Sequence, residues 1–110
     1  MPTYTISLTQ AQAMTSKFRD EKETMLTEEY QNRDILPNCE TFDRAPFDQL
    51  LGLNECAEIR IYYGMNEDSQ VRAIIVAVDS SGEDILPPTE GAVIVEEGRP
   101  CPTLCPTNLL

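Results

Sequence analysis

The chain has 110 residues, a length typical of one domain, and 41% of them are hydrophobic, enough for one modest core. Its 19 acidic and 8 basic residues give a formal net charge of −11, which repels nucleic-acid phosphates and anionic lipids, so neither is an expected partner. The sequence has no histidine, which excludes Ser-His and Cys-His nucleophile pairs and removes the commonest general base and metal ligand.

A long helix is predicted from residue 7 to about residue 27. Ser7 followed three residues later by Gln10 forms a capping box. Apolar side chains then recur at helical spacing as far as Phe18, and the stripe returns at Met25. Such a helix is about 30 Å long. It therefore either lies across the rest of the fold or projects its second half toward a partner, which makes Phe18 and Met25 candidate interaction residues.

A short second helix is expected after Pro46, which suits the first position of a helix, and Gly52 supplies its stop signal. The remainder predicts strands. The segment 56–63 alternates apolar and polar residues, with Ile59, Ile61 and Tyr63 on one face, as in a half-buried strand.

Two further strands are expected. The β-branched run 71–79 is apolar on both faces, as in a central strand. Acidic turns flank this run, and Gly82 suits a left-handed turn position. Pro87 and Pro88 confine the next segment to an edge strand or a loop. We expect a third strand over residues 92–97.

This order of elements favours an α+β fold, with the long N-terminal helix packed on a small antiparallel sheet of about three to four strands. We expect one domain over residues 1–97 and an extended tail containing cysteine and proline over 98–110. The prolines in the tail argue against a helix and against ladder hydrogen bonds there, because proline has no main-chain N–H. The tail could strap onto the domain, bind a partner as an extended peptide or stay disordered. Leu104 is its candidate interaction residue.

The cysteines allow several interpretations. A zinc site is a low-ranking alternative because just one close pair exists, and its candidate ligands are Cys101, Cys105 and Cys56. The C-P-T-L-C spacing is one residue longer than a redox C-x-x-C motif. A disulfide could close this loop, although a cytoplasmic location argues against a permanent one. The favoured interpretation is a buried Cys56 and free thiols in the tail.

The acidic turns could in principle hold a cation, but solvated turns explain them better because neither fits a calcium loop. Tyr62 and Tyr63 beside Arg60 could orient a ligand, although tyrosine in a strand more often packs. Because no carboxylate pair stands out, we predict no catalytic residue, no enzyme activity and no cofactor.

Several segments together resemble a family of small uncharacterised bacterial proteins: LTQAQAMTSKFR, CAEIRIYYGMNED with its I-R-I-Y-Y-G strand, VAVDSSGEDIL, and the cysteine–proline ending GRPCPTLCP. The resemblance implies the same fold class, carries no activity, and leaves Cys39 outside the shared pattern.

The first ten residues lack the basic and apolar regions of a secretory signal, and no apolar run approaches the roughly 18 residues of a membrane span. We therefore expect a soluble, cytoplasmic, acidic accessory or protein-interaction domain that self-associates or offers its tail to a partner. The alternative is a thiol-based metal-binding or redox protein that uses Cys101 and Cys105.

Overall fold

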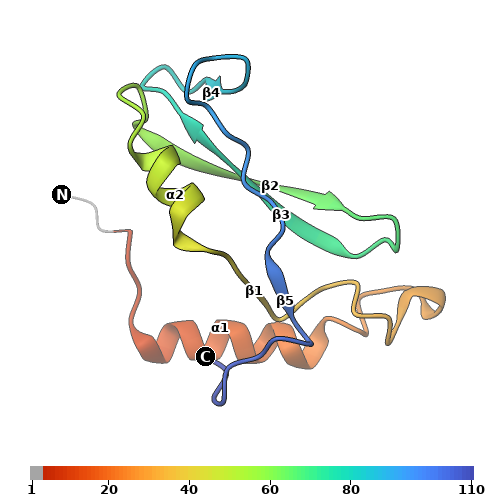
Figure 1. Cartoon of the computed structure of the whole chain (residues 1–110). Coiled ribbons are helices and arrows are strands. Elements are labelled where there is room, and N and C mark those ends of the chain that lie inside the picture. The colour runs from red at the N-terminus through yellow and green to blue at the C-terminus, as the bar shows by residue number, and fades with distance from the viewer. Residues whose placement is uncertain (1–3) are drawn as a thin grey trace.

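The computed structural model describes residues 4–110, so the first three residues of the N-terminal stretch tested for a signal lie outside it (Figure 1). The predicted α+β class is confirmed. Three strands form one antiparallel sheet in the order β2-β3-β4, and β1 and β5 form a second. In chain order the elements are α1 (Leu8–Glu21), a 3-10 turn (Glu28–Tyr30), β1 (Cys39–Thr41), α2 (Arg44–Leu51), β2 (Glu58–Met65), β3 (Val71–Val78), β4 (Asp84–Ile85) and β5 (Arg99–Cys101).

The β2–β3 hairpin matches the two strands that the sequence predicts most strongly. Its register pairs Glu58 with Val78 at one end and Met65 with Val71 at the other. At the β3–β4 turn, Gly82 adopts the left-handed conformation expected of it, with φ of 84°. The side chain of Asp79 closes the same turn by accepting hydrogen bonds from two main-chain amides, at 2.8 and 3.0 Å.

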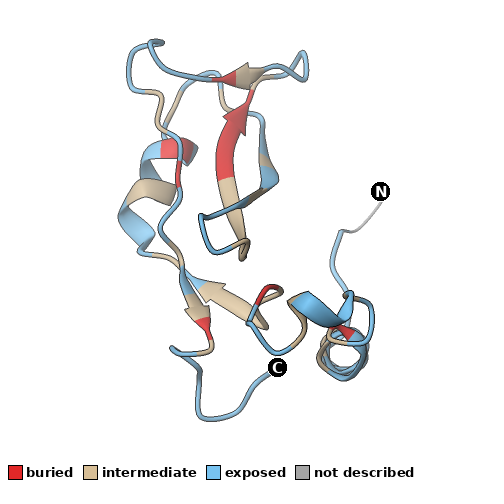
Figure 2. Ribbon diagram, turned by 90° about the vertical axis from the view of Figure 1, so that its right-hand side faces the viewer, coloured by how far each residue is buried: buried red, intermediate tan, exposed pale blue. Residues whose placement is uncertain are grey.

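The core lies between β3 and α2. Leu50 of α2 packs against Ile75 and Ala77 of β3, and Ile85 and Val95 complete the buried cluster. Figure 2 shows the buried residues gathered mainly on these elements. Most of the other described residues are partly or fully exposed, so the core of this chain is small.

The predicted third strand over 92–97 is wrong. Val95 alone forms an isolated antiparallel bridge, to Ile75, and exchanges two hydrogen bonds with it (2.8 and 2.9 Å). Gly91 and Glu97 on either side have positive φ values of 79° and 64°, which break the extended backbone.

The first strand was expected to be half-buried, and this is also wrong. Ile59, Ile61 and Tyr63 do share one face of β2, but they are 39%, 52% and 81% exposed. β2 is an edge strand, and α2 covers the sheet on the β3 side.

The N-terminal helix is shorter than predicted and lies apart from the three-stranded sheet (Figures 1 and 2). The capping box of Ser7 and Gln10 is present, but α1 ends at Glu21 instead of about residue 27. None of the residues of α1 is buried. The apolar stripe of the helix is too narrow to form a second covering layer, since it is interrupted directly after Phe18. Within residues 4–110, no helix is long and apolar enough to cross a membrane.

The tail forms a ladder that its prolines had been expected to prevent. β5 pairs with β1 although Pro100 lies at its centre, opposite Glu40. Each strand has three residues, and an edge strand of that kind tolerates a residue without an N–H. Further along, the main-chain oxygen of Leu110 accepts hydrogen bonds from Thr15 (2.6 Å) and Arg19 (2.7 Å) of α1. The tail thus follows the strap alternative and contacts both β1 and α1.

Candidate functional site at the open edge of the sheet

The outer edge of β3 is fully occupied by other parts of the chain. The main-chain amide of Val71 donates to the carbonyl of Ile35 (2.7 Å), and that of Ile75 donates to the carbonyl of Val95 (2.8 Å). Between them, the amide of Ala73 donates to the carboxylate of Glu40 (2.9 Å). The stretch 35–40 and Val95, together with β4 at the far end, therefore satisfy this side of the strand.

The outer edge of β2 has no such cover from the part of the chain that the structure describes. In an antiparallel pair, main-chain groups point alternately toward and away from the partner strand. Asn66 donates its amide to the carbonyl of Gln70 across the hairpin (3.0 Å), so the odd-numbered residues of β2 point their N–H and C=O groups outward. Within residues 4–110, we find no hydrogen bond from another segment to these outward groups.

The same odd-numbered residues carry an exposed apolar stripe. We call it the β2 edge surface, and it consists of Ile59, Ile61, Tyr63 and Met65. All four side chains are exposed, from 39% for Ile59 to 81% for Tyr63. An unpaired strand edge combined with an apolar face is a template for pairing with another strand. This is the feature of the molecule that points most directly to an interaction.

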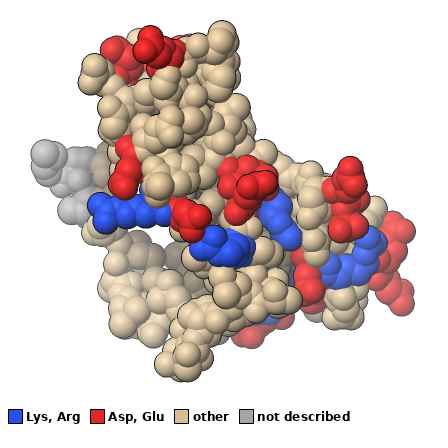
Figure 3. All heavy atoms as spheres, viewed as in Figure 1, with Lys and Arg blue, Asp and Glu red and all other residues tan. Residues whose placement is uncertain are grey.

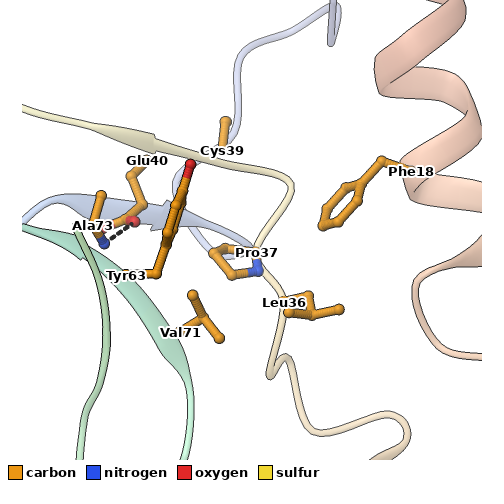
Figure 4. Close-up of a pocket in the computed structure, with 8 residues that line it drawn as sticks. All are labelled: Phe18, Leu36, Pro37, Cys39, Glu40, Tyr63, Val71 and Ala73. Atoms are coloured by element: carbon orange, nitrogen blue, oxygen red, sulfur yellow. Dashed lines mark hydrogen bonds between the residues drawn. The ribbon is translucent and has the colours of Figure 1, made fainter. Parts of the chain in front are cut away.

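A cavity of about 270 Å³ adjoins this surface at Tyr63 (Figure 4). Tyr63 of the β2 edge surface forms one wall, and Phe18 of α1 lies on the opposite side. Most of the lining is apolar, and the complete lining is Phe18, Leu36, Pro37, Cys39, Glu40, Tyr63, Val71 and Ala73.

Glu40 is the charged group of this cavity and is anchored there. Its Oε1 holds the amide of Ala73, as Figure 4 shows, and its buried Oε2 has no hydrogen-bond partner within the described residues. A Cβ added to Gly98 would come within 2.6 Å of that Oε2, so Gly98 permits the close approach of the two segments. The carboxylate therefore has a structural role, since it links β1 to β3 beside Gly98.

On the opposite face of the sheet, three polar side chains form a hydrogen-bonded cluster. Arg60 of β2 donates to Asp84 of β4 at 2.5 Å, and the hydroxyl of Tyr62 donates to the other carboxylate oxygen. The bond from Tyr62 is the main cause that lowers the pKa of Asp84, and Arg60 adds to it. The same bond raises the pKa of Tyr62. These contacts bridge across β3, so the cluster fastens the sheet and the hydroxyl of Tyr62 has a structural hydrogen-bonding role.

A pH prediction follows from this cluster. Because the folded pKa of Asp84 is lowered, its carboxylate stabilises the fold above the unfolded pKa of about 3.9, and this contribution is lost as the pH falls through the folded value. We expect Asp84→Asn to lower the urea midpoint at pH 7 and to lower it less at pH 3. Tyr62→Phe should show the same trend in chemical denaturation. An equal midpoint difference at both pH values would contradict this assignment.

The predicted interaction residues lie in separate places. Phe18 and Met25 border one shallow depression along α1 and are 39% and 76% exposed. Leu104 is 48% exposed in the tail and borders neither this depression nor the cavity. The sequence did not single out the β2 edge surface, because alternation was interpreted as burial.

The predicted metal candidates are not brought together. Cys101 and Cys105 form a disulfide, which corrects the expectation of free tail thiols and leaves neither sulfur as a thiolate ligand. Cys56 is a free thiol packed against the core cluster. Among residues 4–110, no group of three or more suitable side chains could hold a metal ion.

Comparisons with protein-family models, curated proteins and solved structures gave no match.

Proposed function

We propose that this chain is a non-catalytic protein-interaction domain that associates with a second copy of itself through the outer edge of β2. The observation that carries the proposal is the coincidence of free main-chain groups with the exposed apolar side chains of the β2 edge surface. Strand addition uses both, since the backbone supplies hydrogen bonds and the alternate side chains supply contact area. Two β2 strands related by a two-fold axis would join their sheets into one.

The pattern of residues on β2 is self-complementary. In an antiparallel pair centred on Ile61, Ile59 lies opposite Tyr63 of the second copy, which continues the apolar stripe. On the other face Glu58 lies opposite Gly64 and Arg60 opposite Tyr62, so no two like charges meet directly. An isologous dimer requires this kind of match.

Charge and shape are compatible with association. The net charge of −11 opposes it in general, but charges farther apart than about 8 Å are screened at physiological salt. Figure 3 shows wide areas without charged groups on the part of the molecule that carries the sheet. Acidic groups gather at the top of that part and near the segment that follows α1. The radius of gyration is 16.2 Å, against about 13 Å for a compact domain of similar length. A partner would cover surface that this open arrangement leaves accessible.

Light scattering coupled to size exclusion tests the proposal. We expect wild-type protein to be dimeric at high concentration and Ile61→Lys to be monomeric, because the ammonium would be placed at the centre of the interface. Ile94→Lys is the matched control: Ile94 is 51% exposed, like Ile61, but lies beside Val95 beyond the other edge of β3. It should remain dimeric.

A second variant separates backbone pairing from side-chain contact. Ile61→Pro removes an outward N–H that the β2–β3 ladder does not use, so the hairpin should stay folded while dimerisation is lost. A wild-type protein that stays monomeric at every concentration, or an Ile61→Lys variant as dimeric as the Ile94→Lys control, would refute the proposal.

The cytoplasmic location, the absence of nucleic-acid partners and the resemblance to small bacterial proteins stay predictions. The disulfide between Cys101 and Cys105 bears on the location, because such bonds persist in oxidising compartments and are mainly transient or catalytic in the cytosol. Fractionation of the source cells with thiol trapping at lysis would test the location and the state of this bond together.

A further inference from the structure

Three of the four cysteines meet where β1 pairs with β5. The register places Cys39 directly opposite Cys101, and Cys101 is bonded to Cys105. Cys39 keeps a free thiol, is partly accessible, and lines the cavity beside Phe18 and Tyr63. A free thiol therefore lies across the ladder from one sulfur of a disulfide.

The separation across the ladder suits a bond between Cys39 and Cys101. Directly opposed residues of an antiparallel pair have their Cα atoms about 4.5 or 5.5 Å apart, depending on the type of pair, and their side chains project from the same face. Disulfides join cysteines whose Cα atoms are about 4.4–6.8 Å apart. Both types of pair fall within that range, so the register brings the two Cα atoms to a separation that a disulfide can span.

We propose that Cys39, Cys101 and Cys105 form a thiol–disulfide exchange site in which the bond moves between two positions. The thiolate of Cys39 attacks Sγ of Cys101, and the bond from Cys101 to Cys105 breaks. A bond between Cys39 and Cys101 forms, and Cys105 leaves as a thiolate that takes up the proton lost by Cys39. One disulfide and one thiol are present before and after, so the step needs no oxidant or reductant.

Exchange would change what the molecule presents to solvent. Cys101 is fully buried and Cys105 is exposed, so the bond would move inward and a reactive thiol would appear at the surface. The loop over residues 101–105 would lose its covalent closure but keep the hydrogen bond from Leu104 to the carbonyl of Pro100 (2.9 Å). At the same time Cys39 would be withdrawn as a free thiol from the cavity wall. The site would thus offer an exposed thiol to disulfide-bearing molecules.

Peptide mapping after alkylation tests this proposal. Trypsin leaves Cys39 in peptide 34–44, Cys56 in 45–60 and both tail cysteines in 73–110, because it does not cleave before Pro100. The protein is incubated without oxidant at mildly alkaline pH, where more of the thiol is ionised, and is then trapped with N-ethylmaleimide. We expect peptide 34–44 joined to 73–110, with Cys105 alkylated. On a denaturing, non-reducing gel the protein should run as a single chain, because the new bond lies within one molecule.

Matched serine variants isolate the role of Cys39. Cys56→Ser should behave as wild type, whereas Cys39→Ser should keep the 73–110 peptide internally bonded and leave Cys105 unlabelled. In Cys105→Ser, glutathione disulfide should drive formation of the bond between Cys39 and Cys101. The proposal is overturned if wild type keeps only the internal bond, if Cys105 is labelled equally in Cys39→Ser, or if Cys105→Ser yields only glutathione adducts or a bond to Cys56.

Discussion

Replacing Leu50 with alanine is expected to lower the free energy of unfolding by about 2–5 kcal/mol. Leu50 is completely buried at the centre of the cluster formed by α2, β3 and β4. The described residues contribute nine buried hydrophobic side chains in all, so few neighbours could move in to fill the cavity. Small domains have about 5–15 kcal/mol of stability, so this loss is a large part of the total.

The neighbouring residue provides a matched control for this prediction. Leu51 is 62% exposed on the same helix, so Leu51→Ala should change the free energy of unfolding by no more than about 0.5 kcal/mol. Urea denaturation followed by far-ultraviolet circular dichroism measures both variants, at equal protein concentration because association would add to stability. Equal losses for the two variants would mean that α2 does not bury the face assigned to it.

Local sequence patterns predicted the elements that local interactions form. The capping box places the start of α1 at the correct residue because Ser7 and Gln10 satisfy each other within one turn. The β-branched run of β3 predicts a central strand, and β3 does lie between β2 and β4. Gly82 predicts a turn because left-handed backbone favours glycine.

Non-local pairing is what the sequence could not reveal. β1 and β5 are three residues long and about 60 positions apart, and neither has enough alternation to predict a strand. Pro100 even argued against a ladder there. The position of Cys39 opposite Cys101 depends entirely on this register, so residues that looked unrelated in the sequence form the exchange site.

The sequence pattern also failed to predict which face of β2 is buried. An alternating segment such as 56–63 predicts one buried face, but which strand a helix covers is set by tertiary packing. Here α2 covers β3 and leaves the β2 edge surface exposed. The candidate interaction site is therefore found where the sequence predicted core. Alternation shows that a face is suited to burial and does not identify what buries it.

Lys22 ties α1 to the rest of the chain. It is the C-cap residue of α1 and is buried, with a relative exposure of 8%. Its ammonium donates to the carbonyl of Leu36 at 2.7 Å and to the side-chain oxygen of Asn38 at 2.8 Å. It also lies 5.8 Å from the ring centre of Phe18, a cation–π distance. A lysine within the apolar stripe therefore forms a buried contact to the segment that leads into β1.

Lys22→Met should consequently destabilise the attachment of α1. Methionine keeps much of the apolar stem but removes the ammonium, which leaves two oxygen acceptors near it without their donor, at a cost of about 1–3 kcal/mol. Hydrogen exchange should show the loss locally: protection falls across α1 while the amides of β3 keep theirs, because the core cluster does not include α1. Lys17→Met on the exposed face of the same helix should leave both regions unchanged. Unaltered protection of α1 in Lys22→Met would show that the tail contacts of Thr15 and Arg19 hold the helix without it.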